Sequence, residues 1–140
     1  MKVYDFEGMV LGRIASRVAK DLLKGENVVV VNAEKAVISG DPQSIIKRYV
    51  ERLHKGDPKK GPFYPKTPDG IVKRTIRGML PWHKPRGRDA FKRLKVFVGV
   101  PKEFEGKERI KLEDANVDKL RCKYITVGDL AVALGAKKRW

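Results

Sequence analysis

The sequence predicts a single α/β domain with a mostly parallel sheet, and three observations lead to this prediction. Apolar residues between Leu11 and Leu22 recur at intervals of three and four, which is the period of an amphipathic helix. The uninterrupted run Val28–Val31 is typical of a strand that is covered on both faces. Strand-like and helix-like segments then alternate along residues 1–140, and no linker-like stretch divides them.

Local signals place the elements of the first half of the chain. A short β-prone segment is expected at 3–6, and the helix that begins near Leu11 should end at Gly25, a typical residue after a helix C-terminus. Another short apolar segment occupies 36–39. Asp41 and the following proline are a favourable start for a second helix, which we expect to run to Leu53.

The second half of the chain is expected to alternate between loops, helices and one strand. These are a proline-rich loop at 54–69, a helix at 71–80, a basic loop at 83–88, a short helix at 89–94 and a strand at 95–100. Thr126 and Asp129 form the capping box of a last helix, which Gly135 ends. Residues 101–123 show no clear period, so no element is predicted there.

Positive charge dominates the composition and is concentrated in the middle of the chain. Lys and Arg number 32 against 17 Asp and Glu, which gives a net charge of +15. Residues 56–95 hold 12 basic and 3 acidic side chains, whereas each flank carries only +3. Because a purely solubilising surface mixes the two signs, this clustering predicts a surface for the phosphates of a nucleic acid. A generally basic protein without such a role remains the alternative.

Several classes of function are excluded at this stage. No apolar run approaches the roughly 18 residues of a membrane-spanning helix, and the first residues, with Asp5 and Glu7, do not read as a signal or transit peptide. Cys122 is the single cysteine, which excludes an internal disulfide and fits a reducing cytosol. His54 and His83 lack partners at metal-ligand spacing. We therefore expect no membrane partner, metal, cofactor, catalytic residue or small-molecule substrate.

The segment between Gly8 and Gly12 is the basis of an alternative function, that of a small nucleotide-binding enzyme. It joins a predicted strand to a predicted helix, where dinucleotide-binding turns direct helix N–H groups at a phosphate. The full Gly-x-Gly-x-x-Gly pattern and the P-loop pattern are absent, and Asn32 stands where an acidic residue would follow the second strand. A tight turn, or close helix packing, would require the same glycines.

The strongest functional signal lies between Lys59 and Arg93, where two proline-rich basic loops flank a helix with a basic polar face. Cations neutralise phosphates, while guanidinium and aromatic planes stack on unpaired bases. The candidate RNA-binding residues are Arg13, Lys59, Lys60, Lys66, Lys73, Arg74, Arg77, His83, Lys84, Arg86, Arg88, Lys92 and Arg93. The candidate base-stacking residues are Phe63, Tyr64 and Trp82, although these rings could equally pin the loops to the core.

Two segments carry a resemblance to a known family. Residues 61–66 (GPFYPK) and 78–96 (GMLPWHKPRGRDAFKRLKV) resemble ribosomal protein thirteen of the large subunit, in its archaeal and eukaryotic branch. The likeness continues in residues 8–16, 31–35 and 98–106, so it covers nearly the whole chain. The proline-rich loop is of the archaeal type, and residues 107–123 match least well.

The resemblance implies more about fold and function than the residue patterns do. It implies a three-layer α/β/α fold around a four-stranded parallel sheet, with the basic loop–helix–loop at about 56–95 as an insertion in one domain. It also implies a structural component of the large ribosomal subunit that binds rRNA and joins early in assembly. Neighbouring large-subunit ribosomal proteins are the other implied partners, and the ribosome in the cytoplasm is the implied location.

Overall fold

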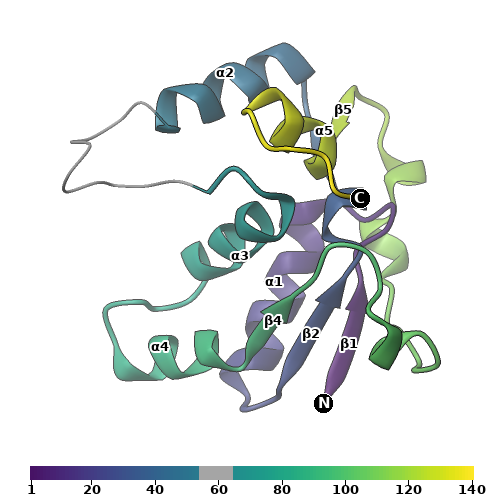
Figure 1. Ribbon diagram of the computed structural model, residues 1–140. Coiled ribbons are helices and arrows are strands. Elements are labelled where there is room, and N and C mark those ends of the chain that lie inside the picture. Colours follow the sequence, from purple (N-terminus) through teal and green to yellow (C-terminus); the bar gives the residue numbers. More distant parts are fainter. Residues whose placement is uncertain (54–64) are drawn as a thin grey trace.

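The centre of the computed structural model, which describes residues 1–53 and 65–140, is a parallel sheet of three strands (Figure 1). β1 (Lys2–Asp5) and β4 (Leu94–Val96) lie on either side of β2 (Val28–Val31), and both pair with β2 in parallel. The predicted α/β class and the mostly parallel sheet are confirmed.

Each face of the sheet packs against a different layer. One face belongs to the main core, in which Val28 and Val30 pack with the apolar stripe of α1 (Leu11–Leu23). The other face forms a smaller cluster that Phe104 closes from a short 3-10 helix, Lys102–Phe104. Both faces are therefore covered, as a three-layer arrangement requires, although one covering layer is an irregular segment rather than an α-helix.

The expected fourth strand of the parallel sheet is wrong. β3 (Val37–Ser39) instead pairs antiparallel with β5 (Tyr124–Thr126) in a separate two-stranded sheet. After β2 the backbone turns at Asn32, which has a φ of 56°, and then passes through the 3-10 helix Ala33–Lys35. This turn takes β3 out of the sheet that contains β2. Its partner β5 follows directly on the stretch that showed no periodicity in the sequence.

The predicted helices are present, with one correction. α2 (Pro42–Leu53), α3 (Pro68–Gly78) and α5 (Val127–Ala133) lie where the sequence placed them. The expected basic loop at 83–88 is largely helical, because α4 runs from Pro85 to Lys92. Proline suits the first position of a helix, since its missing N–H would have no intrahelical partner there.

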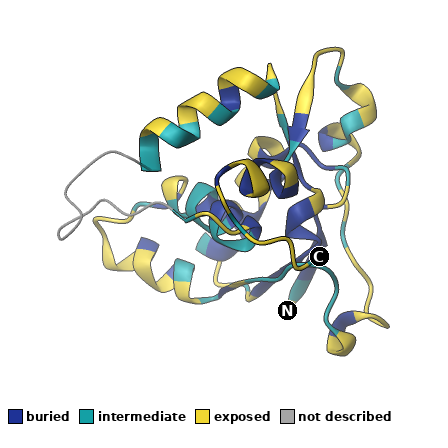
Figure 2. Cartoon of the chain, turned by 45° about the horizontal axis from the view of Figure 1, so that its top comes forward, coloured by how far each residue is buried: buried dark blue, intermediate teal, exposed yellow. Residues whose placement is uncertain are grey.

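The position of α2 leaves space beside α3. Ile45 is the one fully buried residue of α2, and Ile46, Tyr49, Val50 and Leu53 are partly buried against the core. Figure 2 shows the buried residues gathered at the centre, with much of α2 and α4 exposed. None of the helices in the described part of the chain is long and apolar enough to cross a membrane.

A buried polar contact joins β1 to α1. The Tyr4 hydroxyl donates a hydrogen bond to the Asp21 carboxylate, and Lys2 Nζ lies 3.4 Å from the same carboxylate. Burial and the hydrogen bond to Asp21 raise the pKa of Tyr4 to about 12. The phenol therefore stays protonated and keeps its role as donor throughout the physiological pH range.

The close packing of α4 against the turn after α3 requires a glycine. Gly87 is buried, and a Cβ atom at this position would lie 2.1 Å from the carbonyl oxygen of Pro81. The backbone of α4 thus approaches the turn after α3 more closely than a side chain would permit. At the far end of α4, Arg93 Nη2 donates to the Leu22 carbonyl over 2.8 Å, which ties the segment to α1.

We expect Gly87→Ala to destabilise the protein by about 1–3 kcal/mol, because the added methyl group must displace backbone. Gly12→Ala is the matched control, since a Cβ at exposed Gly12 meets nothing within 4 Å. That change should be neutral or stabilise by roughly 0.5–1 kcal/mol, as a helical glycine gives way to alanine. Thermal unfolding followed by circular dichroism distinguishes the two variants. Equal melting temperatures would contradict the conclusion that α4 packs too closely on Pro81 for a side chain at position 87.

Candidate nucleic-acid interface

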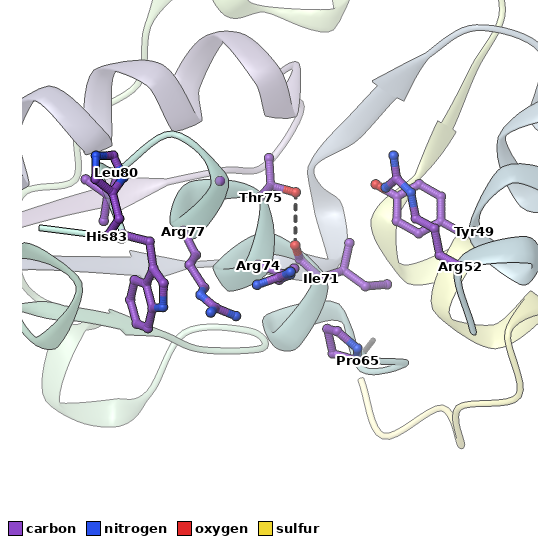
Figure 3. A pocket seen from close by; sticks show the side chains of 11 residues that line it. Tyr49, Arg52, Pro65, Ile71, Arg74, Thr75, Arg77, Leu80 and His83 are labelled. Atoms are coloured by element: carbon purple, nitrogen blue, oxygen red, sulfur yellow. Dashed lines mark hydrogen bonds between the residues drawn. The ribbon is translucent and has the colours of Figure 1, made fainter. Parts of the chain in front are cut away.

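A groove of about 680 Å³ runs between α2, α3 and the turn that leads to α4 (Figure 3). We call it the basic groove because three arginines and a histidine lie among its lining residues. These lining residues are Tyr49, Arg52, Pro65, Ile71, Arg74, Thr75, Arg77, Gly78, Leu80, Trp82 and His83. The groove therefore combines cations with aromatic and aliphatic surface.

The amphipathic character of α3 places its arginines in the groove. Its apolar residues Ile71, Val72 and Ile76 are buried in the core, which turns the opposite side of the helix outward. Arg74 and Arg77 lie half-buried on the groove side, and Figure 3 shows their guanidinium groups close to one another. The core-facing stripe of α3 thus fixes where its charges point.

One wall of the groove, which we call the α3–α4 wall, is formed by α3 and the turn to α4. Cations and rings alternate from this wall into α4 itself. Arg77 Cζ lies 4.1 Å from the centroid of the Trp82 ring, and Lys73 Nζ lies 5.5 Å from that of Phe91. The two rings meet edge to face at a centroid separation of 5.2 Å. Cation–π and edge-to-face contacts both stabilise such a chain. Trp82 contacts Phe91 of α4, yet it remains 36% exposed.

The α2 wall of the groove carries a second stacked pair, which the sequence analysis missed. Arg52 Cζ lies 4.9 Å from the centroid of the Tyr49 ring. The available signal was the spacing of three residues, which places a ring and a guanidinium side by side on a helix that leads into the basic loop.

Electrostatics within the groove favour an anionic ligand. Desolvation and the neighbouring positive charge of Arg74 lower the pKa of Arg77 from its ordinary value. The ordinary value is so high that Arg77 remains charged at neutral pH. Two guanidinium groups held near each other repel, and a phosphate beside them would relieve that repulsion.

Most other predicted RNA-binding residues lie on the rim of the groove or on α4. Arg88 Nη1 donates to the Trp82 carbonyl over 3.4 Å, a weak contact that keeps this side chain near the turn. The exposed members of this group are Lys66, His83, Lys84, Arg86, Arg88 and Lys92. Four predicted residues, Lys59, Lys60, Phe63 and Tyr64, lie outside the described residues.

Arg13 and Arg93 are each held by a backbone carbonyl. Arg13 Nη1 donates to the Asp114 carbonyl over 2.8 Å, on an exposed part of α1. Arg13 also lines a second hollow of about 380 Å³ that shares Tyr49 and Thr75 with the basic groove. Arg93 is half-buried and directed at α1 through its bond to the Leu22 carbonyl. Its Nε atom is buried without a hydrogen-bond partner among the described residues.

Backbone carbonyls of the protein occupy three N–H groups of the turn between β1 and α1. The N–H groups of Gly8, Met9 and Val10 donate to the carbonyls of Lys35, Phe6 and Ala115, over 3.1, 3.0 and 2.7 Å. Gly8 has a φ of 68°, which fits the tight-turn explanation of this glycine. Across residues 1–53 and 65–140 there is also no group of three or more side chains that could hold a metal ion.

Comparison with known proteins identifies the family. Residues 1–103 match the model of the family described as Ribosomal protein L13. The chain belongs to this family. The family is one of ribosomal proteins rather than of enzymes, so the nucleotide-dependent enzyme is not supported.

Similar proteins in archaea match nearly the full chain. The large ribosomal subunit protein uL13 of Archaeoglobus fulgidus is 51% identical over 135 residues, which cover 95% of this chain and 86% of that protein. The protein of the same name from Methanosarcina barkeri is 51% identical over 139 residues, and that from Methanocaldococcus jannaschii is 50% identical over 143. Each alignment covers 98% of this chain and 99% of the relative. The resemblance seen in the sequence is confirmed.

We expect Arg93→Ala to lower the free energy of unfolding by roughly 1–3 kcal/mol, because the Leu22 carbonyl loses a charged donor. Arg86→Ala is the matched control, since Arg86 is exposed on the same helix and should change stability by less than about 0.5 kcal/mol. Urea unfolding measures both variants. If Arg93→Ala is as stable as the control, Arg93 does not hold α4 against α1.

Proposed function

We propose that the protein is a structural component of the large ribosomal subunit and binds its rRNA through the basic groove and the exposed face of α4. Its relatives are named large ribosomal subunit proteins, which supports the assignment to that subunit. The observation that carries RNA binding is the basic groove itself, where Arg74 and Arg77 lie together beside stacked aromatic rings.

The arrangement suits the phosphate backbone of RNA. Arginine presents donors in a planar fork that binds phosphate in a bidentate manner, and Arg86 and Arg88 are exposed on α4 next to the groove. Lys84 and Lys92, at the two ends of the same helix, extend this positive surface. Such contacts fix the position of the protein on RNA and carry little sequence information.

We also propose that the protein joins the subunit early in assembly. Its binding surface is held by its own core and by α4, so no other protein is needed to form it. Neighbouring large-subunit ribosomal proteins would contact parts of the surface that rRNA leaves uncovered. The corresponding location is the ribosome in the cytoplasm.

Changing Arg74, Arg77, Arg86 and Arg88 together to Ala should weaken binding to a transcript of the large-subunit rRNA by orders of magnitude. The physical reason is the loss of counterion release, which contributes roughly 0.7–0.9 to the salt slope for each phosphate contact. We therefore expect the slope of log K against log salt to become shallower by about 3. Filter binding between about 50 and 200 mM salt measures both quantities.

The matched control removes the same charge elsewhere. Its four residues, all exposed and outside the groove and α4, are Lys95, Lys102, Arg109 and Lys119, each changed to Ala. This variant should lose much less affinity than the groove variant. Wild-type affinity in a folded groove variant, or binding by the wild type that does not respond to salt, would refute the proposal.

A further inference from the structure

Each of the two walls of the basic groove carries an arginine whose guanidinium lies over an aromatic ring. On the α3–α4 wall the guanidinium of Arg77 lies over the ring of Trp82, and on the α2 wall that of Arg52 lies over the ring of Tyr49. All four side chains line the groove, and Figure 3 labels three of them, Arg77, Arg52 and Tyr49. A ring behind a guanidinium restricts its orientation, so each arginine presents a fixed flat surface rather than a mobile charge.

The Trp82 ring is itself held in place. Phe91 meets it edge to face at 5.2 Å, and Phe91 in turn lies beneath the ammonium group of Lys73. The guanidinium of Arg77 is therefore supported by a series of side-chain contacts that continues into α4. Arg77 covers one face of the indole, so at that face a ligand would meet the guanidinium plane and not the ring.

We propose that the basic groove binds unpaired RNA, with one base stacked on the guanidinium plane of Arg77 and another on that of Arg52. The inference rests on the proposed RNA-binding function and specifies what the groove recognises. It assigns Trp82 the role of support for Arg77, in place of the direct base-stacking role expected from the sequence. It also adds Arg52 and Tyr49 to the binding residues.

The size and lining of the groove favour unpaired RNA. Clefts of about 300–1,000 Å³ hold ligands of the size of a nucleotide, and the groove of about 680 Å³ falls within this range. Its aliphatic lining by Pro65, Ile71 and Leu80 suits a base and contributes nothing to binding a phosphate. The nearby charge of Arg74 would then attract a phosphate of the same RNA.

An acidic peptide is the competing ligand, and the observations favour RNA over it. Carboxylates are recognised by charge and by the edge of a guanidinium, so they have no use for the face that the rings orient. A base uses that face, because nucleobases stack on guanidinium planes and on aromatic rings. The guanidinium faces that the rings orient on both walls therefore suit a base better than a carboxylate.

The test compares two RNA ligands of equal charge, hexaadenylate and a hexamer of abasic ribose phosphates, using the full-length protein. We expect the wild type to bind hexaadenylate at least about 5-fold more tightly, since stacking a base on a protein surface has an effect of this order. The double variant Arg52→Lys with Arg77→Lys keeps both charges and removes both planes. Its preference for hexaadenylate should fall to about 1. Fluorescence anisotropy of end-labelled ligands measures the four affinities.

Arg48→Lys is the matched control, because Arg48 is exposed on α2 and does not line the groove. This variant should keep the wild-type preference for hexaadenylate. A double variant that is folded and keeps that preference overturns the inference, and so does a wild type that binds both hexamers equally. An acidic hexapeptide that displaces hexaadenylate at equal concentration would also overturn it. Failure of the wild type to bind the rRNA transcript would instead refute the proposed function, so the two failures can be distinguished.

Discussion

The basic surface of this protein depends on the close approach of Gly87 to the backbone of Pro81. This contact holds α4 close to the turn that follows α3. Because α4 lies so close, its residue Phe91 contacts Trp82 in that turn. Trp82 in turn supports Arg77. Cations from two helices are thereby fixed on one surface before any ligand arrives. Such pre-organisation reduces the conformational entropy that the side chains lose on binding.

The apolar core makes this concentration of charge tolerable. On α3 the buried residues Ile71, Val72 and Ile76 each contribute about 1.5–3 kcal/mol by leaving water. Repulsion between Arg74 and Arg77 is much weaker than this sum, because both side chains are half exposed and solvent screens them. The fold can therefore hold like charges together. An anion beside them would lower this repulsion.

The parts of the fold that the sequence predicts are those in which one segment carries a distinctive pattern of its own, either a period or an unbroken apolar run. The stripe of α1 and the run of β2 are of this kind, and both lie where they were expected. The pairing of β3 with β5 could not be predicted, since two strands of three residues have no period and meet only through the folded core. The start of α4 at Pro85 was signalled by the proline, but the basic composition of the segment suggested a loop instead.

In the candidate site too, the sequence does not predict how single side chains are oriented. Arg93 and Arg52 are the same residue type; Arg93 lies near the end of the basic segment 56–95, and Arg52 lies just before its start. The fold directs Arg93 toward the carbonyl of Leu22, whereas it places Arg52 over Tyr49 in the groove. Charge counting identifies a region of the chain that suits an RNA partner, because phosphates attract every cation in it. Which of those cations faces the ligand is decided by the neighbours against which each packs, and these become known only when the helices are assembled.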